Sequence, residues 1–201
     1  MKTMSEPVTY EVPTWEQIYE MLIELANRVR KSEFKPDVLL GISRGGWPPA
    51  RVVSDLLENP NIANMKIEFY VDIGRTSKKP VITQPISVNV HNRKVLIIDD
   101  VADTGKSLAV ARRHLARKGA TQVKIATIYC KPHSIVKPDY YMKETSAWII
   151  FPWERFEATK LLVERAKKDG KPLASVVDEL KKGGLDEKIV KRFVEIITGE
   201  S

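Results

Sequence analysis

One stretch, residues 95–107, constrains the fold of this chain more than any other part of the sequence. Four apolar residues, Val95 to Ile98, run directly into the carboxylates Asp99 and Asp100. An unbroken apolar run of this length is typical of a strand buried on both faces of a parallel sheet. A Thr-Gly-Lys-Ser turn and the helix-like segment 108–117 follow. The stretch therefore predicts a strand, a turn and a helix of an α/β fold.

The turn after this strand carries groups that suit a sugar phosphate. It lies at the carboxyl end of the strand, where open α/β sheets bind ligands. N–H groups at the start of the next helix favour an anion. Asp99 and Asp100 offer carboxylates for hydroxyls or a metal, and Asp103 is a third acid nearby. An ATP-binding P-loop is rejected because it needs a glycine five residues before the glycine of Gly-Lys-Ser, and that position holds Asp100.

The stretch resembles the motif with which type I phosphoribosyltransferases bind phosphoribosyl pyrophosphate (PRPP). That motif has an apolar strand, two acids, two spacer residues and a Thr-Gly-Lys-Ser/Thr loop. In these enzymes an acid directly before Thr-Gly is typical of the 6-oxopurine branch, and Asp103 has this position. A generic strand-turn-helix would not account for three acids and a Gly-Lys-Ser loop so close together. The resemblance implies the family's α/β fold, with a central, mostly parallel sheet flanked by helices.

The resemblance also implies a role for each polar residue of the stretch. Asp99 and Asp100 hold the ribose hydroxyls of PRPP, directly or through Mg²⁺, a hard cation that keeps several of its waters. Asp103 takes a proton from the imidazole side of the purine, and it can also act as a helix N-cap. The 5′-phosphate is held by Ala102, Asp103, Thr104, Gly105, Lys106 and Ser107.

A second motif, Gly-Ile-Ser-Arg-Gly-Gly at residues 41–46, follows the buried strand predicted at 38–42. Its paired glycines allow the backbone to approach a ligand closely. Alone, such a pair is often only a tight turn. Beside the first motif it resembles the family's pyrophosphate-binding loop, which reads Ser-Arg-Gly-Gly in bacterial xanthine-guanine enzymes and can contain a cis peptide. The resemblance implies pyrophosphate contacts from Ser43, Arg44 and Gly45.

Three further residues are predicted to bind the base. A lone lysine at a strand end, such as Lys131 after strand 123–130, is usually solvated. In the 6-oxopurine enzymes, however, a lysine at this place donates to the oxygen at the six-position. Residues 146–154 resemble the Trp-Ile-x-x-Pro-Trp stretch of xanthine-guanine enzymes, which implies that Trp148 stacks on the base and Ile149 contacts it through the backbone. Trp153 is interpreted as a packing residue.

The segment between the two motifs departs from the family. Residues 70–85 lack the Ser-Tyr pair that often closes over PRPP, and Arg75, Thr76 and Lys78 are the best candidates for that role. Residues 74–80 are predicted to form a polar loop between a strand at 65–71 and an extended arm at 81–90. This departure leaves adenine open as a substrate.

The C-terminal segment is predicted to form two or three short helices. Its apolar residues recur at helical spacing, with glycines at 170, 183 and 184 as helix stops. We therefore expect a catalytic domain at 1–154 and a C-terminal helical extension at 155–201. At the other end, Thr14 to Gln17 form a capping box at the start of an amphipathic helix.

Charge and composition narrow the class of protein. The net charge of +7 suits either anionic nucleotides or nucleic acid. The segment 155–201 has a net charge of only +2, whereas an appended nucleic-acid reader should concentrate positive charge. There is no long apolar run or signal-like segment. The single Cys130 is expected to be an inert core thiol. The three histidines, His91, His114 and His133, show no metal-ligand spacing and are expected to be solvated or structural, with no zinc site. We expect a cytoplasmic protein without a membrane partner, and its abundance of Lys, Arg and Glu is common in thermophiles.

Taken with the resemblance, these features predict a purine phosphoribosyltransferase of the salvage pathway. It would join hypoxanthine, guanine or xanthine to PRPP, giving a purine nucleoside monophosphate and pyrophosphate with Mg²⁺ as cofactor. An adenine-specific enzyme is the first alternative, and a PRPP- or nucleotide-sensing regulator that binds nucleic acid is the second. Relatives are usually dimers or tetramers, so a homodimer or homotetramer is expected.

Overall fold

The computed structural model describes residues 9–71 and 78–199. Contacts divide the chain into two compact units, one formed by Ile18–Ser146 and the other by the residues up to Gln17 together with those from Ala147 onward. The sequence assigns catalysis to residues 1–154 and an extension to residues 155–201. This assignment of function stays a prediction.

The larger unit is built on a six-stranded sheet with the order β4-β3-β2-β5-β6-β7. Its strands are β2 (Val38–Ser43), β3 (Ile62–Val71), β4 (Lys78–Gln84), β5 (Lys94–Ala102), β6 (Gln122–Cys130) and β7 (Tyr140–Glu144). All neighbouring strands are parallel except β3 and β4, which are antiparallel. The predicted α/β fold with a central, mostly parallel sheet is confirmed.

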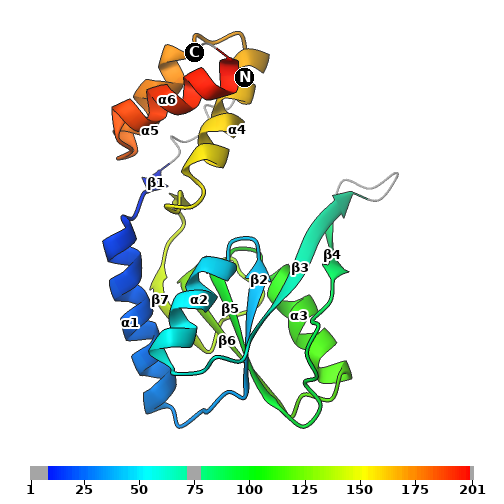
Figure 1. The fold of residues 1–201 in the computed structure, drawn as a ribbon. Coiled ribbons are helices and arrows are strands. Elements are labelled where there is room, and N and C mark those ends of the chain that lie inside the picture. Colours follow the sequence, from blue (N-terminus) through cyan, green and yellow to red (C-terminus); the bar gives the residue numbers. More distant parts are fainter. Residues whose placement is uncertain (1–8, 72–77, 200–201) are drawn as a thin grey trace. The chain divides into compact units, whose positions relative to one another are not determined.

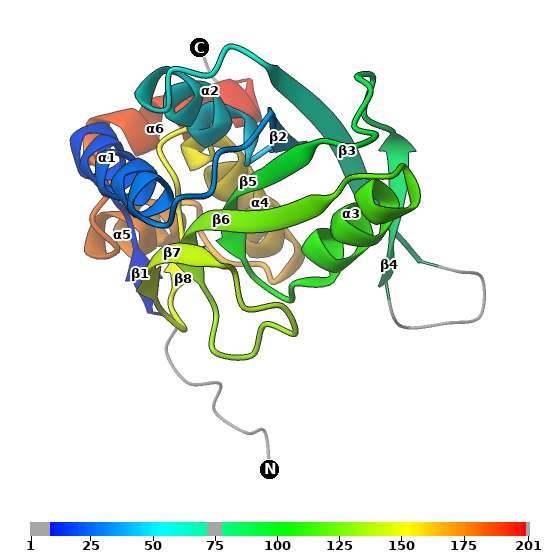
Figure 2. The same cartoon turned by 90° about the horizontal axis from the view of Figure 1, so that it is seen from below.

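Helices cover both faces of this sheet. Figures 1 and 2 show α3 (Lys106–Arg117) on one face and α1 (Trp15–Lys31) and α2 (Trp47–Leu56) on the other. The predicted capping box starts α1: Gln17 N donates to Thr14 Oγ1 at 3.1 Å, and Thr14 N donates to Gln17 Oε1 at 2.9 Å. Prolines in the first turn of α2 are tolerated because an N–H there has no helical partner.

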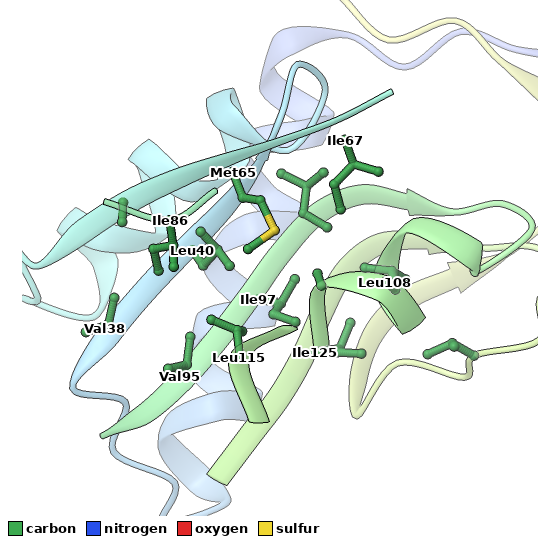
Figure 3. Packing of buried hydrophobic residues seen from close by; sticks show 14 of the residues in the cluster. Val38, Leu40, Met65, Ile67, Ile86, Val95, Ile97, Leu108, Leu115 and Ile125 are labelled. Carbon is green, nitrogen blue, oxygen red and sulfur yellow. The ribbon is translucent and has the colours of Figure 1, made fainter. Parts of the chain in front are cut away.

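The core between the sheet and α3 follows from strand alternation. Leu40 of β2 and Ile97 of β5 point to the face of the sheet that α3 covers. There they share one core cluster with Leu108 and Leu115 of α3, and all four side chains are at most 1% exposed (Figure 3). Apolar burial of this kind stabilises the fold by about 1.5–3 kcal/mol for each large side chain. It also makes β5 and α3 a rigid pair, which fixes the turn between them.

The polar loop predicted at 74–80 is wrong at its C-terminal end. Residues 78–80 belong to β4, where Pro80 pairs with Phe69 of β3. β4 is the edge strand of the sheet, which is where a sheet tolerates proline. The candidates Arg75 and Thr76 lie outside the described residues, and nothing is described of the side chain of the third, Lys78.

The smaller unit contains a two-stranded parallel sheet and three helices. Its elements are β1 (Tyr10–Glu11), β8 (Trp148–Ile149), α4 (Arg155–Lys168), α5 (Ala174–Lys182) and α6 (Glu187–Thr198). Gly170 and Gly184 have positive φ and follow α4 and α5, as predicted for helix stops. The helices pack their apolar stripes against one another and against Ile150. The expectation of short C-terminal helices is confirmed.

Candidate active site

Three loops meet at the carboxyl edge of the sheet, because β2, β5 and β6 are adjacent and parallel. In register, Gly41 of β2 pairs with Ile98 of β5, and Ala102 of β5 pairs with Cys130 of β6. Each of these strands ends in one of the predicted binding segments. The larger unit therefore brings together residues 43–46, 99–107 and 131–136, which the sequence separates widely.

The loop after β5 has the geometry of an anion site. Gly105 has φ of +74° and is the N-cap of α3, and as a glycine it has no side chain with which to cap the helix. The amide of Lys106 donates to Thr104 Oγ1 over a long 3.4 Å, and the amides that open a helix favour an anion. Asp99, Asp103, Thr104 and Ser107 help to line a cavity of about 90 Å³ at this turn.

Glycine at position 105 is required by its surroundings as well as by its φ. A Cβ there would lie 2.6 Å from Ser134 Oγ and 2.7 Å from Val136 N. Both contacts are too short for any side chain, and the second is with backbone. The loop after β6 is therefore packed directly against residues 102–107, the anion turn.

The two carboxylates at the end of β5 are buried. Asp99 is 9% and Asp100 is 7% exposed. Asp99 Oδ1 accepts from Asp100 N at 3.1 Å, and Asp100 Oδ1 accepts from Val101 N at 2.7 Å. Carboxylate oxygens at this place can accept hydrogen bonds from hydroxyls or bind a hard cation.

The loop after β2 packs onto these carboxylates. A Cβ at Gly45 would collide with the carboxylate of Asp100, and one at Gly46 would lie 2.8 Å from Asp99 Oδ1. The peptide between Ser43 and Arg44 is cis, as the resemblance allowed. The glycines predicted to permit close approach to a ligand thus also permit close approach to the two acids.

Lys131 follows β6 and is only 8% exposed. Its backbone N donates to Ala102 O at 2.9 Å, which ties it to the end of β5. A buried lysine is not the solvated residue usually found at a strand end. Next to it, Cys130 is buried and burial raises the pKa of its thiol, so the expectation of an inert core thiol agrees with its surroundings.

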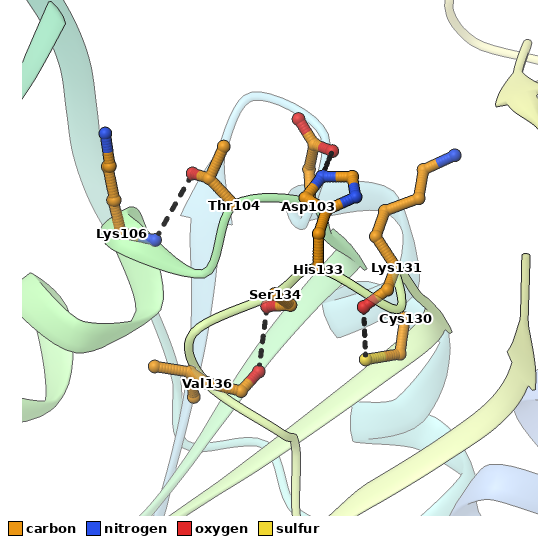
Figure 4. A network of polar contacts seen from close by, with 8 residues as sticks. All are labelled: Asp103, Thr104, Lys106, Cys130, Lys131, His133, Ser134 and Val136. Atoms are coloured by element: carbon orange, nitrogen blue, oxygen red, sulfur yellow. Dashed lines mark hydrogen bonds and ion pairs between the residues drawn. The ribbon is translucent and has the colours of Figure 1, made fainter. Parts of the chain in front are cut away.

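Asp103 has a partner that the sequence did not indicate. His133 Nε2 lies 3.3 Å from Asp103 Oδ1, as Figure 4 shows. Both side chains are more than 60% exposed. The sequence predicts only a solvated or structural role for His133, because its spacing matches no metal-binding pattern. The sequence signal that could have indicated this contact is the position of His133 two residues after Lys131, in the loop that follows β6, the strand next to β5.

Trp148 and Ile149 form β8 of the smaller unit. Trp148 N donates to Thr9 O at 2.8 Å, and its ring lies 5.5 Å from that of Tyr10 at an interplanar angle of 36°. Their predicted part in base binding stays a prediction. Trp153 stacks on Phe151 with ring centroids 5.0 Å apart, in agreement with a packing role.

The acids at the carboxyl edge do not make a metal cage by themselves. Within residues 9–71 and 78–199 no group of three or more His, Cys, Asp or Glu residues could hold a metal ion. Two adjacent carboxylates instead suit a cation whose remaining ligands come from phosphate oxygens and water. In the same parts of the chain, no helix has the length and apolarity to cross a membrane.

Sheet order, anion turn and paired acids define a family. Residues 11–157 match the phosphoribosyl transferase domain, and the chain belongs to this family. The predicted type I phosphoribosyltransferase fold is thereby confirmed.

Individual relatives carry more specific names. The chain is 32% identical over 144 residues to a xanthine-guanine phosphoribosyltransferase of Nitratidesulfovibrio vulgaris. The aligned residues cover 70% of this chain and 82% of that protein. It is 39% identical to a purine phosphoribosyltransferase of Pyrococcus horikoshii whose crystal structure matches with a TM-score of 0.65, covering 72% of this chain and 93% of that one. A xanthine-guanine-hypoxanthine phosphoribosyltransferase of Helicobacter pylori, 21% identical with a TM-score of 0.64, has the same fold.

Proposed function

We propose that this protein is a purine phosphoribosyltransferase, which transfers the 5-phosphoribosyl group of PRPP to a free purine and releases pyrophosphate. The observation that carries the proposal is the meeting of the anion turn, Asp99, Asp100 and Lys131 at one edge of the sheet. The names of the relatives, which are purine and xanthine-guanine enzymes, support the same substrate class. Hypoxanthine, guanine and xanthine are the proposed bases.

PRPP would lie across the loops that follow β2 and β5. Its 5′-phosphate would accept from the amides of residues 102–107, with Gly105 allowing the turn. Its ribose hydroxyls would donate to Asp99 and Asp100. Its pyrophosphate would meet the loop of Ser43, Arg44 and Gly45, where Arg44 supplies a positive charge. Each end of the substrate is thus held, which fixes the anomeric carbon between them.

Mg²⁺ fits the donor set as the cofactor. Asp99 and Asp100 are two hard oxygen ligands at the ribose end of the proposed site, and a magnesium site of this kind takes its other ligands from substrate and water. When bound, the ion would supply positive charge to the leaving pyrophosphate. The two acids would hold it through their carboxylate oxygens, directly or through water.

The base would be selected by Lys131. An ammonium group only donates hydrogen bonds, so a buried lysine favours an oxygen at the six-position over an amino group. Trp148 is proposed to stack on the ring, and the backbone of Ile149 to contact its edge. Adenine stays the alternative, because backbone carbonyls accept from an amino group.

Asp103 would be the general base. It stands at the opening of the anion turn, outside the pair of buried acids, and its carboxylate is accessible. As pyrophosphate leaves, cationic character develops on the ribose and the purine nitrogen attacks from the opposite face. The purine N–H proton then passes to a carboxylate oxygen of Asp103, and the electron pair of that bond stays on the base.

We further propose a homodimer or homotetramer located in the cytoplasm. A single buried cysteine, Cys130, suits a reducing compartment. Light scattering after size exclusion tests the oligomer: a mass of one chain would contradict it.

The test of the activity is a panel of hypoxanthine, guanine, xanthine and adenine with PRPP and Mg²⁺, following pyrophosphate release. We expect rapid release with 6-oxopurines and slow release with adenine. Release with adenine alone would assign the chain to adenine. Release with no purine would overturn the proposed function.

A further inference from the structure

Two backbone hydrogen bonds join the loop after β6 to the loop after β5. Lys131 N donates to Ala102 O at 2.9 Å, and Ile135 N donates to Thr104 O at 3.1 Å. Asp103 lies between the two acceptors, and His133 lies midway between the two donors. The paired backbones therefore place residues 103 and 133 opposite each other.

The loop around His133 is further braced by its own contacts. Ser134 N donates to Lys131 O at 3.1 Å, and Ser134 Oγ donates to Val136 O at 2.9 Å. Pro132 fixes one backbone dihedral immediately before the histidine. The contact between His133 Nε2 and Asp103 Oδ1, at 3.3 Å, thus rests on a held backbone and not only on a choice of rotamers (Figure 4).

This contact contributes little to stability. The two side chains are 63% and 61% exposed, and pairs exposed to this extent typically contribute about 0–1 kcal/mol. For catalysis, however, an accessible carboxylate that accepts a proton has to be held in one orientation. Without a partner it samples several side-chain orientations, and a general base works only within hydrogen-bond reach of the proton.

We propose that His133 is a positioning residue for Asp103 in the proposed transfer reaction. The Nε2–H of the imidazole donates to Oδ1 and holds the carboxylate, which leaves Oδ2 as the oxygen that accepts the purine proton. His133 itself touches no reacting atom. The inference rests on the proposed function and adds to it a residue outside both recognised motifs.

Two substitutions separate the hydrogen bond from the bulk of the ring. His133→Phe keeps a planar ring and removes the donor, whereas His133→Gln retains an N–H donor at a similar reach. We expect His133→Phe to slow single-turnover ribosylation of hypoxanthine about tenfold, with the KM values for hypoxanthine and PRPP within twofold of wild type. His133→Gln should recover a rate within about threefold. His91→Phe, in an exposed turn before β5, is the matched control and should keep the wild-type rate.

The outcomes are distinguishable. A His133→Phe rate within twofold of wild type overturns the proposal, as do equal losses in His133→Phe and His133→Gln. A rise in KM without a fall in rate would mean that His133 binds substrate and does not position the base. Wild-type protein that ribosylates no purine overturns the proposed function and the inference together.

The contact is also tested without turnover. In the free protein, the ¹⁵N resonance of His133 Nε2 should shift when Asp103 is changed to Asn, and that of His91 should not. No shift at His133 would show that the pair does not form, even if the enzyme is active.

Discussion

Gly105→Ala tests the packing of the anion turn most sharply. Gly105 has φ of +74°, and a Cβ there would lie 2.6 Å from Ser134 Oγ and 2.7 Å from Val136 N. Gly170 has a similar φ of +66°, but nothing lies within 4 Å of its added Cβ. The two substitutions therefore share the backbone strain and differ in the steric conflict.

The expected magnitudes follow from these two contributions. A left-handed conformation costs an alanine about 1–2 kcal/mol, and this is the whole expected effect of Gly170→Ala. Overpacking adds about 1–3 kcal/mol at Gly105. In a chain of this size each kcal/mol lowers the melting temperature by about 2–4 °C. Urea denaturation of the two variants measures the difference directly.

The two variants should also differ in their affinity for PRPP. To admit the Cβ, the start of α3 must move away from the 131–136 loop, which displaces the amides proposed to bind the 5′-phosphate. We expect Gly105→Ala to weaken PRPP binding at least tenfold, about 1.4 kcal/mol, and Gly170→Ala to leave it unchanged. Equal stabilities and equal PRPP affinities for the two variants would refute the reasoning.

Three further predictions concern the proposed metal, the base and the helices. The double change Asp99→Asn and Asp100→Asn should weaken binding of Mg²⁺–PRPP by calorimetry at least tenfold; unchanged affinity would exclude these acids from the ribose site. Lys131→Met should reduce kcat/KM for hypoxanthine about tenfold, as loss of a charged hydrogen bond costs about 1.5–3 kcal/mol; unchanged PRPP affinity is its control, and an unchanged kcat/KM would place the lysine outside the base site. Deleting residues 157–201 exposes Ile150, which is 1% exposed, so the melting temperature should fall while PRPP still binds; a stable truncated protein with altered purine selectivity would instead assign these helices to the base site.

The elements predicted well from the sequence are those with local causes. The capping box at Thr14, the apolar run before Asp99 and the glycine stops after α4 and α5 each depend on residues within one or two turns of each other. Each carries its full physical explanation in a short window, so its structure is readable without the rest of the chain. The anion turn belongs with them, since Gly105 and the helix it starts are adjacent.

The features that were missed depend on pairing between distant segments. The polar character of residues 74–80 predicts a loop that includes Pro80, but the place of Pro80 at the sheet edge depends on pairing with Phe69. The contact of His133 with Asp103 depends on the parallel register of β5 and β6 and on the two backbone bonds between their loops. The collision that excludes a side chain at Gly45 depends on β2 lying beside β5. No local pattern encodes these neighbours.

The central claim is that one accessible carboxylate at this sheet edge accepts the purine proton during ribosyl transfer. The most direct measurement is the single-turnover rate of hypoxanthine ribosylation by Asp103→Asn, with PRPP affinity measured by calorimetry on the same protein. Asparagine keeps the shape of the side chain and removes its basicity. We predict a rate lower by about 10²–10⁴-fold with PRPP affinity nearly unchanged. A rate within a few-fold of wild type would contradict the account.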